Sequence, residues 1–166
     1  MAGDWIDLGG RMLAATLGGA VLGFERSRQN RAIMGFRTLS LVGLASCIAV
    51  LAIVHSGLPQ MNADAAGRVV QGVLSGVGFI GAGALIRGGG IGPGAGEVHG
   101  LATAASIWVS AATGAAAALA VWPLIAGGVL IALFVLLVGQ GVERRIRNAA
   151  RAGPEEADRR SIDMHP

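Results

Sequence analysis

The sequence has no lysine and no tyrosine, and it has a single cysteine, Cys47. One cysteine excludes an intramolecular disulfide and a zinc site built on several cysteines. Aromatic residues make up only 4% of the chain, which leaves no stacking platform for nucleic-acid bases. Charged residues make up 14%, against about 25% in an ordinary soluble domain. Because the charges also gather in short islands, a water-soluble globule is a poor description of this chain.

The sequence contains long uncharged hydrophobic runs, and 53% of its residues are apolar and 28 are glycines. A bilayer core needs about 20 apolar residues in a helix. The uncharged run from Gly100 to Val142 has about twice that length, so we expect the Trp122-Pro123 pair to divide it. The sequence predicts an all-α, polytopic transmembrane helix bundle with five spans, at about residues 5–24, 38–54, 69–86, 101–120 and 123–141. We expect residues 1–142 to form the membrane domain and residues 143–166 a short basic cytoplasmic tail.

The arginines predict the orientation of these spans, because cytoplasmic loops carry an excess of basic residues. Eleven of the 13 basic residues fall on one side, in the first loop, the third loop and the tail: Arg26, Arg28, Arg31, Arg37, Arg87, Arg144, Arg145, Arg147, Arg151, Arg159 and Arg160. We expect the N-terminus outside and the C-terminus in the cytoplasm, with no nucleic-acid partner. The first span opens with Asp4 and Asp7 instead of a basic region, so we expect it to be retained and not cleaved as a signal peptide.

Glycines recur at helix-packing distances along the spans. Residues 76–81 match the G-x-G-x-x-G pattern of dinucleotide-binding folds, but no βαβ unit surrounds them. Pairs of small residues four apart instead let transmembrane helices approach closely. We expect Gly19 with Gly23, and Gly72 with Gly76, to pack helices, and the glycine-rich span 69–86 to be central or locally unwound beside neighbouring helices. The segment Gly88–Gly96 lacks the ending of a phosphate-binding loop and is read as a linker.

Hydroxyl groups lie on one face of the fourth span, at Thr103, Ser106, Ser110 and Thr113. Such groups bond to a carbonyl one turn back or to another helix. They could equally line a polar path through the membrane. Both interpretations stay open from the sequence.

Two pairs of charges mark the first span. An ionisable residue inside a span is costly and is a functional candidate by default, which applies to Arg11. The alternative is that Arg11 extends toward water and pairs with Asp7, one turn away. At the other end, Glu25 is a plausible partner for Arg37. No arrangement of nucleophile and base appears, and no metal or cofactor site is expected.

Four ordered motifs resemble the MgtC/SapB/YhiD family of bacterial inner-membrane proteins. They are LGGAVLGFER at 17–26, GFRT at 35–38, SGVGFIGAG at 75–83 and VHGLATAASIW at 98–108. The resemblance covers about residues 8–140 and implies a five-span, multi-pass protein of the inner membrane. It implies functional roles for the matching polar residues, namely Arg11, Glu25, Arg26, Arg37, Thr38, Thr103 and Trp108. Only about 25 residues follow the fifth span, so we expect a short form without the soluble C-terminal domain of some members.

The resemblance also implies a role without a reaction. Members are associated with growth in low magnesium and with stress adaptation, through contact with another membrane complex such as the proton-translocating ATP synthase. We therefore expect a non-enzymatic modulator whose partners are the lipid bilayer, a membrane protein and copies of the same chain. The alternative is a small cation or proton transporter or channel.

Overall fold

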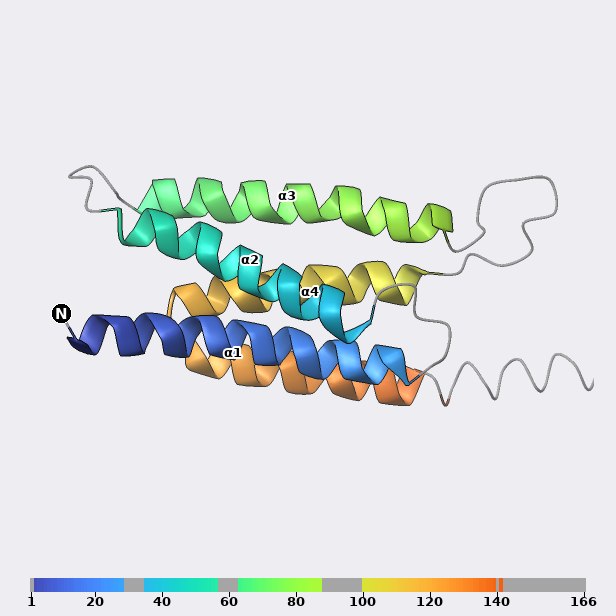
Figure 1. Cartoon of the computed structure of the whole chain (residues 1–166). Helices are drawn as coiled ribbons and strands as arrows, with labels where there is room; N and C mark the ends of the chain where they lie inside the picture. Colours follow the sequence, from blue (N-terminus) through green and yellow to red (C-terminus); the bar gives the residue numbers. More distant parts are fainter. Residues whose placement is uncertain (1, 29–34, 57–62, 88–99, 140, 142–166) are drawn as a thin grey trace, which may run out of the picture. The chain divides into compact units, whose positions relative to one another are not determined.

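The computed structural model describes residues 2–28, 35–56, 63–87, 100–139 and 141, and these residues are helical apart from short turns. Figure 1 labels α1 (Ala2–Ser27), α2 (Phe36–Val54), α3 (Ala63–Arg87) and α4 (Leu101–Ala118), which run side by side with alternating direction. A last helix follows over Trp122–Gly139. The described residues contain no strand, so the predicted all-α class is confirmed for them. The predicted orientation stays a prediction.

The described helices agree with a membrane protein. Four of them are long and apolar enough to cross a bilayer: α2, most of α3, α4 and the last helix. Helix α1 is not among these four, and it carries Arg11 within its length. Each predicted span overlaps a helix, although α3 begins at Ala63 and so starts well before the predicted residue 69. Asp64 in its first turn favours this extension, because a carboxylate stabilises a helix N-terminus.

The long uncharged run is interrupted where α4 ends, and this helix C-terminus contains no glycine. Ala120 has a φ of 56°, in the left-handed region. The amide of Val121 donates to the carbonyl of Ala116 (3.1 Å), and the amide of Ala120 donates to that of Ala117 (3.0 Å). This is the Schellman pattern, which normally uses glycine at the left-handed position. The Trp122-Pro123 pair follows directly and starts the last helix, as the sequence predicts.

Helices α1, α2 and α4 meet backbone to backbone at glycines. A Cβ at Gly43 would lie 2.6 Å from the carbonyl oxygen of Ala15. A Cβ at Gly19 would collide with the carbonyl of Leu39, and one at Gly114 with the carbonyl of Gly43. Lipid tails are as apolar as leucine, so helices in a membrane associate by such close contact and not by a hydrophobic driving force. Around these points lies a core of small side chains, with Cys47 and Ala117 fully buried.

The expectation that the third span is central is wrong. Of the candidate span windows, 61% of α4 is buried in the chain but only 17% of α3. Helix α4 contacts α1, α2 and α3, whereas α3 contacts α2 and α4 alone among the labelled helices. A Cβ at Gly72 or Gly76 meets nothing within 4 Å, so neither glycine allows a close contact with another helix inside the described chain. A small-residue spacing marks a surface fit for close approach, but it does not say which helices meet there.

We predict that Gly19→Ala destabilises the bundle, because its methyl group must displace the backbone of α2 at Leu39. Overpacking of this kind costs about 1–3 kcal/mol. Thermal unfolding in detergent, followed by circular dichroism, measures the loss. Gly10→Ala on the same helix is the matched control, since its Cβ meets nothing within 4 Å. It should unfold at the same temperature or slightly higher, because alanine favours a helix over glycine. Equal losses in the two variants would contradict this packing.

Candidate functional site

Arg11 ties α1 to the end of α4. Its Nη1 donates to the carbonyl of Ala118 (2.7 Å), and its Nη2 lies 2.7 Å from Oδ2 of Asp7. The Schellman bonds occupy the carbonyls of Ala116 and Ala117, and the Arg11 guanidinium bonds the next one. A cation at a helix C-terminus also interacts favourably with the helix dipole. Arg11 thus forms the predicted pair with Asp7 and also bonds to α4, and a functional role for it stays a prediction.

Arg26 ties the other end of α1 to the start of α4. Its Nη2 donates to Oγ1 of Thr103 (2.6 Å), and the arginine side chain is only 9% exposed. Helix α4 begins after Gly100, whose φ is 108°, and a Cβ there would lie 2.9 Å from the carbonyl of Ala84 on α3. Arg37 is exposed at the start of α2. Arg26 is therefore the second arginine of α1 that bonds across to α4, and the pairing of Glu25 with Arg37 stays a prediction.

The hydroxyl face of α4 bonds both within its helix and across helices. Ser106 and Thr113 donate to carbonyls one turn back, at Ala102 (2.7 Å) and Val109 (2.8 Å). Ser110 donates across the interface to the carbonyl of Leu39 (2.6 Å), and Thr103 accepts from Arg26. All four hydroxyl residues are buried. Thr103 and Ser110 therefore connect α4 to α1 and α2, whereas Ser106 and Thr113 bond within α4, and each of the four hydroxyls bonds to protein.

Two further candidate residues lie away from these contacts. Thr38 is half-buried in the first turn of α2, and Trp108 is exposed on α4. The described residues contain no group of three or more His, Cys, Asp or Glu side chains placed to share a metal ion. His99, the linker and the basic tail lie outside the described residues.

Gly43 and Gly114 are structural residues that the sequence interpretation missed. Each lies where a side chain would collide with a neighbouring backbone. Gly114 is four residues after Ser110 and four before Ala118, so a search for small residues of any type at this spacing would have found it.

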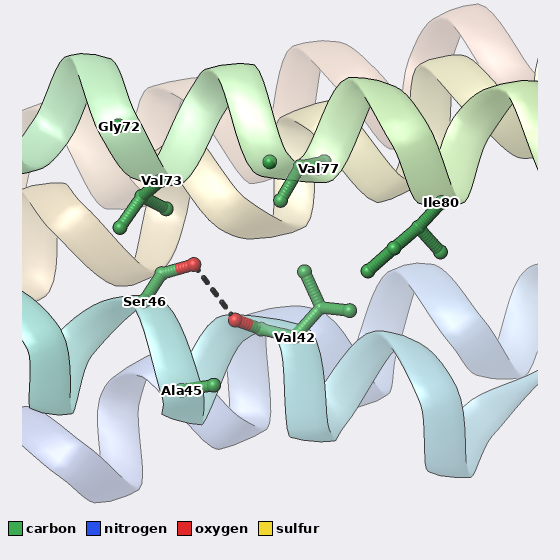
Figure 2. Close-up of a pocket in the computed structure, with 8 residues that line it drawn as sticks. Val42, Ala45, Ser46, Gly72, Val73, Val77 and Ile80 are labelled. Carbon is green, nitrogen blue, oxygen red and sulfur yellow. Dashed lines mark hydrogen bonds between the residues drawn. The ribbon is translucent and has the colours of Figure 1, made fainter.

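An apolar pocket of about 210 Å³ lies between α2 and α3. Figure 2 shows Val73, Val77 and Ile80 of α3 extending toward α2. The only polar side chain in its lining is that of Ser46, whose hydroxyl donates to the carbonyl of Val42 (2.8 Å). The pocket suits an apolar group. Its full lining is Val42, Ala45, Ser46, Gly72, Val73, Gly76, Val77 and Ile80.

These features define a class, namely a helical membrane protein whose spans are joined by glycine contacts and by arginine and hydroxyl bonds. The chain belongs to the MgtC family, whose model matches residues 12–145. It is 39% identical to protein SrpB of Synechococcus elongatus over 89% of this chain and 81% of that protein. It is 37% identical to protein MgtC of Salmonella typhimurium, over 62% of this chain but only 39% of that longer protein.

A third relative is YhiD of Escherichia coli K12, which is named as a candidate magnesium transporter. The two chains are 32% identical over 83% of this chain and 63% of YhiD. No solved structure matches the chain.

We predict that Thr103→Val destabilises the bundle by about 2 kcal/mol, because it removes the hydroxyl that accepts from a buried cation. Thr113→Val is the matched control on the same helix, since that hydroxyl bonds only to the carbonyl of Val109 within α4. It should cost less than about 1 kcal/mol. Urea or thermal unfolding of both variants in the same detergent measures the difference. Identical stabilities would mean that the Arg26 bond contributes nothing.

Proposed function

We propose that this protein is a non-enzymatic protein of the bacterial inner membrane that modulates another membrane complex, such as the proton-translocating ATP synthase. Through that contact it acts in magnesium or stress adaptation. The observation that carries the proposal is the use of the polar residues of the spans as ties between helices. Arg11, Arg26 and Ser110 each bond across to another helix at 2.6–2.7 Å.

These ties argue against a transport path through the described helices. A path for a cation needs oxygen ligands that can exchange from protein to ion. The hydroxyls of α4 instead bond to carbonyls or to an arginine, and all of them are buried. An arginine that holds Thr103 also places a positive charge beside the hydroxyl face, which disfavours a second cation there. A protein so arranged acts on other molecules through its outer surface.

Helix α1 offers such a surface. Leu13, Leu17 and Phe24 recur on one face of the helix and are 58%, 54% and 59% exposed. Their side chains are apolar and lie on the helix that is itself fixed at both ends to α4. A fixed apolar row of this kind loses little conformational entropy when another transmembrane helix packs on it. The names of MgtC and YhiD support the magnesium context of the proposal.

We predict that a photoreactive diazirine side chain at Leu17 captures a specific membrane complex in native membranes. Leu41 on α2 and Leu130 on the last helix, 63% and 65% exposed, extend the survey to other faces. Leu22 is the matched control, because it lies on α1 but is fully buried. Mass spectrometry should identify the same partner from at least one exposed position and none from Leu22. Capture of nothing except copies of this chain from every exposed position would contradict the proposal.

The second candidate function is cation or proton transport, which the name of YhiD and the charged pair of Asp7 and Arg11 favour. We predict that the purified full chain in proteoliposomes moves neither Mg²⁺ nor protons faster than protein-free vesicles do. Fluorescent indicators for Mg²⁺ and pH, enclosed in the vesicles, measure both fluxes.

The control is the double variant Asp7→Ala, Arg11→Ala, used only if its circular dichroism matches that of the unaltered chain. If flux appears with the unaltered chain and disappears with this variant, the protein is a transporter and the proposal that it is a modulator is wrong. Flux that survives in the variant would exclude a pathway through this pair.

A further inference from the structure

The apolar pocket between α2 and α3 is a groove that is open on the outside of these two helices. Its floor includes Ser46 and Val77, which are buried. Its rim includes Ala45, Gly76 and Ile80, which are exposed. Figure 2 shows the groove between the two helices, with Ile80 extending from α3 toward α2. Both helices are long and apolar enough to cross a membrane, so in a bilayer the opening of the groove meets hydrocarbon and not water.

The size and the chemistry of the groove suit an alkyl chain. Gly72 and Gly76 are part of its lining, and a Cβ at either of them meets nothing within 4 Å, so these positions leave room in it. Apolar cavities of about 150 Å³ stay dry and take up benzene. A groove of about 210 Å³ therefore has room for a length of hydrocarbon chain. The hydroxyl of Ser46 already donates to the carbonyl of Val42 (2.8 Å), so it needs no polar ligand.

A positive charge lies beyond one end of this groove. Arg68 is exposed on α3, four residues before Gly72, and is rotated from it by about 40° around the helix. Along the helix axis it lies about 6 Å from Gly72 and about 18 Å from Ile80, the most distant lining residue of α3. The apolar span begins at Asp64, so Arg68 lies near the end of the span and the groove lies deeper within it. Among the described residues, none forms a hydrogen bond or an ion pair with Arg68.

We propose that the groove binds one acyl chain of a membrane glycerophospholipid, whose phosphate is bound by the guanidinium of Arg68. A guanidinium matches a phosphate with two parallel hydrogen bonds. A lipid that lies along α3 has its phosphate near the end of the span and its acyl chain deeper, which is the order of Arg68 and the groove. An apolar helix from another protein would fill the groove but leave the arginine without an anion. This charge complementarity selects the phospholipid.

The surroundings of Arg68 agree with this assignment. Asp64 is exposed one turn earlier on α3 and is rotated from Gly72 by about 80°, against about 40° for Arg68. The carboxylate therefore lies farther from the groove and closer to water. An arginine within an apolar span gains from an anionic partner, and a lipid tail offers none. In the predicted orientation Arg68 lies toward the outer side of the membrane, where the preference of basic residues for the cytoplasm gives no reason for it.

The inference goes beyond the proposed function and does not depend on it. The apolar row on α1 is the surface considered for another complex, whereas the groove lies between α2 and α3. The experiment contains only the purified chain and lipids, so its failure leaves partner capture through α1 measurable, and failure to capture a partner leaves lipid binding measurable.

The test uses the full chain in vesicles of phosphatidylethanolamine and phosphatidylglycerol. A small part of the phosphatidylglycerol carries a photoreactive diazirine in one acyl chain, and mass spectrometry of the irradiated protein locates the attached lipid. We predict stronger labelling at the groove residues Ala45, Val73 and Gly76 than at Leu130. Leu130 is 65% exposed on the last helix and reports the ordinary contact of any lipid with the protein surface.

The contribution of Arg68 is measured by substitution. Arg68→Gln should lower groove labelling relative to Leu130 about fivefold, the factor that one arginine near anionic lipid contributes to binding. Arg68→Lys should lose less, because lysine keeps the charge but not the paired donors. Arg37→Gln is the matched control, because Arg37 is also exposed but lies at the start of α2, at the other end of the groove helices. It should label like the unaltered chain.

A second probe tests the phosphate itself. A diacylglycerol with the same photoreactive chain has no phosphate, so it should label the groove about fivefold less than the phosphatidylglycerol does. It should also label the unaltered chain and the Arg68→Gln variant equally.

The apolar part of the site is tested by filling it. Gly76→Leu should remove most of the groove labelling, because the new side chain occupies space in the lining. Gly78→Leu is the matched control, since its Cβ also meets nothing within 4 Å but Gly78 is not part of the lining. It should keep the labelling. Thermal unfolding in detergent should give the same temperature for all these variants and the unaltered chain.

Several results would overturn the proposal. Groove labelling no stronger than that of Leu130 in the unaltered chain excludes a bound lipid. Equal labelling by the two probes, or unchanged labelling in Arg68→Gln, removes the phosphate contact that selects a phospholipid. An equal loss in Gly76→Leu and Gly78→Leu places the lipid outside the groove. A disulfide-linked dimer of Ala45→Cys chains, without lipid label in the groove, assigns the groove to a second copy of the chain.

Discussion

The structure depends on the close approach of three helix backbones at Gly19, Gly43 and Gly114. In a bilayer, van der Waals contact and interhelical hydrogen bonds must drive the helix association that the hydrophobic effect drives in soluble proteins. Because no side chain separates α2 from α4 at these points, the short hydroxyl of Ser110 reaches the carbonyl of Leu39 at 2.6 Å. Larger residues at the glycines would move the helices apart and break the hydrogen bond between the Ser110 hydroxyl and the Leu39 carbonyl.

The two arginines of α1 extend this contact along the whole helix. Arg11 bonds Ala118 and Arg26 bonds Thr103, so the bonded positions are 15 residues apart on both helices. At 1.5 Å per residue the two ties are about 22 Å apart, which is most of a bilayer core. Equal spacing on antiparallel helices means that one register satisfies both bonds. A shift of α1 along α4 by a single turn would break both and leave two cations in a low-dielectric surrounding.

Much of the fold was predictable from the sequence, and the reasons for the failures are physical. Run lengths, charges and the Trp122-Pro123 pair locate the helices, since these depend on local chemistry and on the thickness of a bilayer. The pairing of Arg11 with Asp7 follows from a four-residue spacing on one helix. The rotation of each helix about its axis does not follow from local sequence. Gly19-x-x-x-Gly23 and Gly72-x-x-x-Gly76 have the same spacing, yet the first pair packs against the backbone of α2 and its start, whereas a Cβ at either glycine of the second pair meets nothing within 4 Å.

The same difference in packing separates α3 from the other three labelled helices. Helices α1, α2 and α4 are locked by backbone contacts and by the bonds of Arg11 and Arg26. Helix α3 is attached to α4 more lightly, through ordinary contacts such as Gly81 with Ala104, where a Cβ would lie at 3.5 Å. Gly72 and Gly76 cost about 1 kcal/mol each in helix propensity relative to alanine, and a Cβ at either of them meets nothing within 4 Å, so this cost brings no close helix contact inside the described chain.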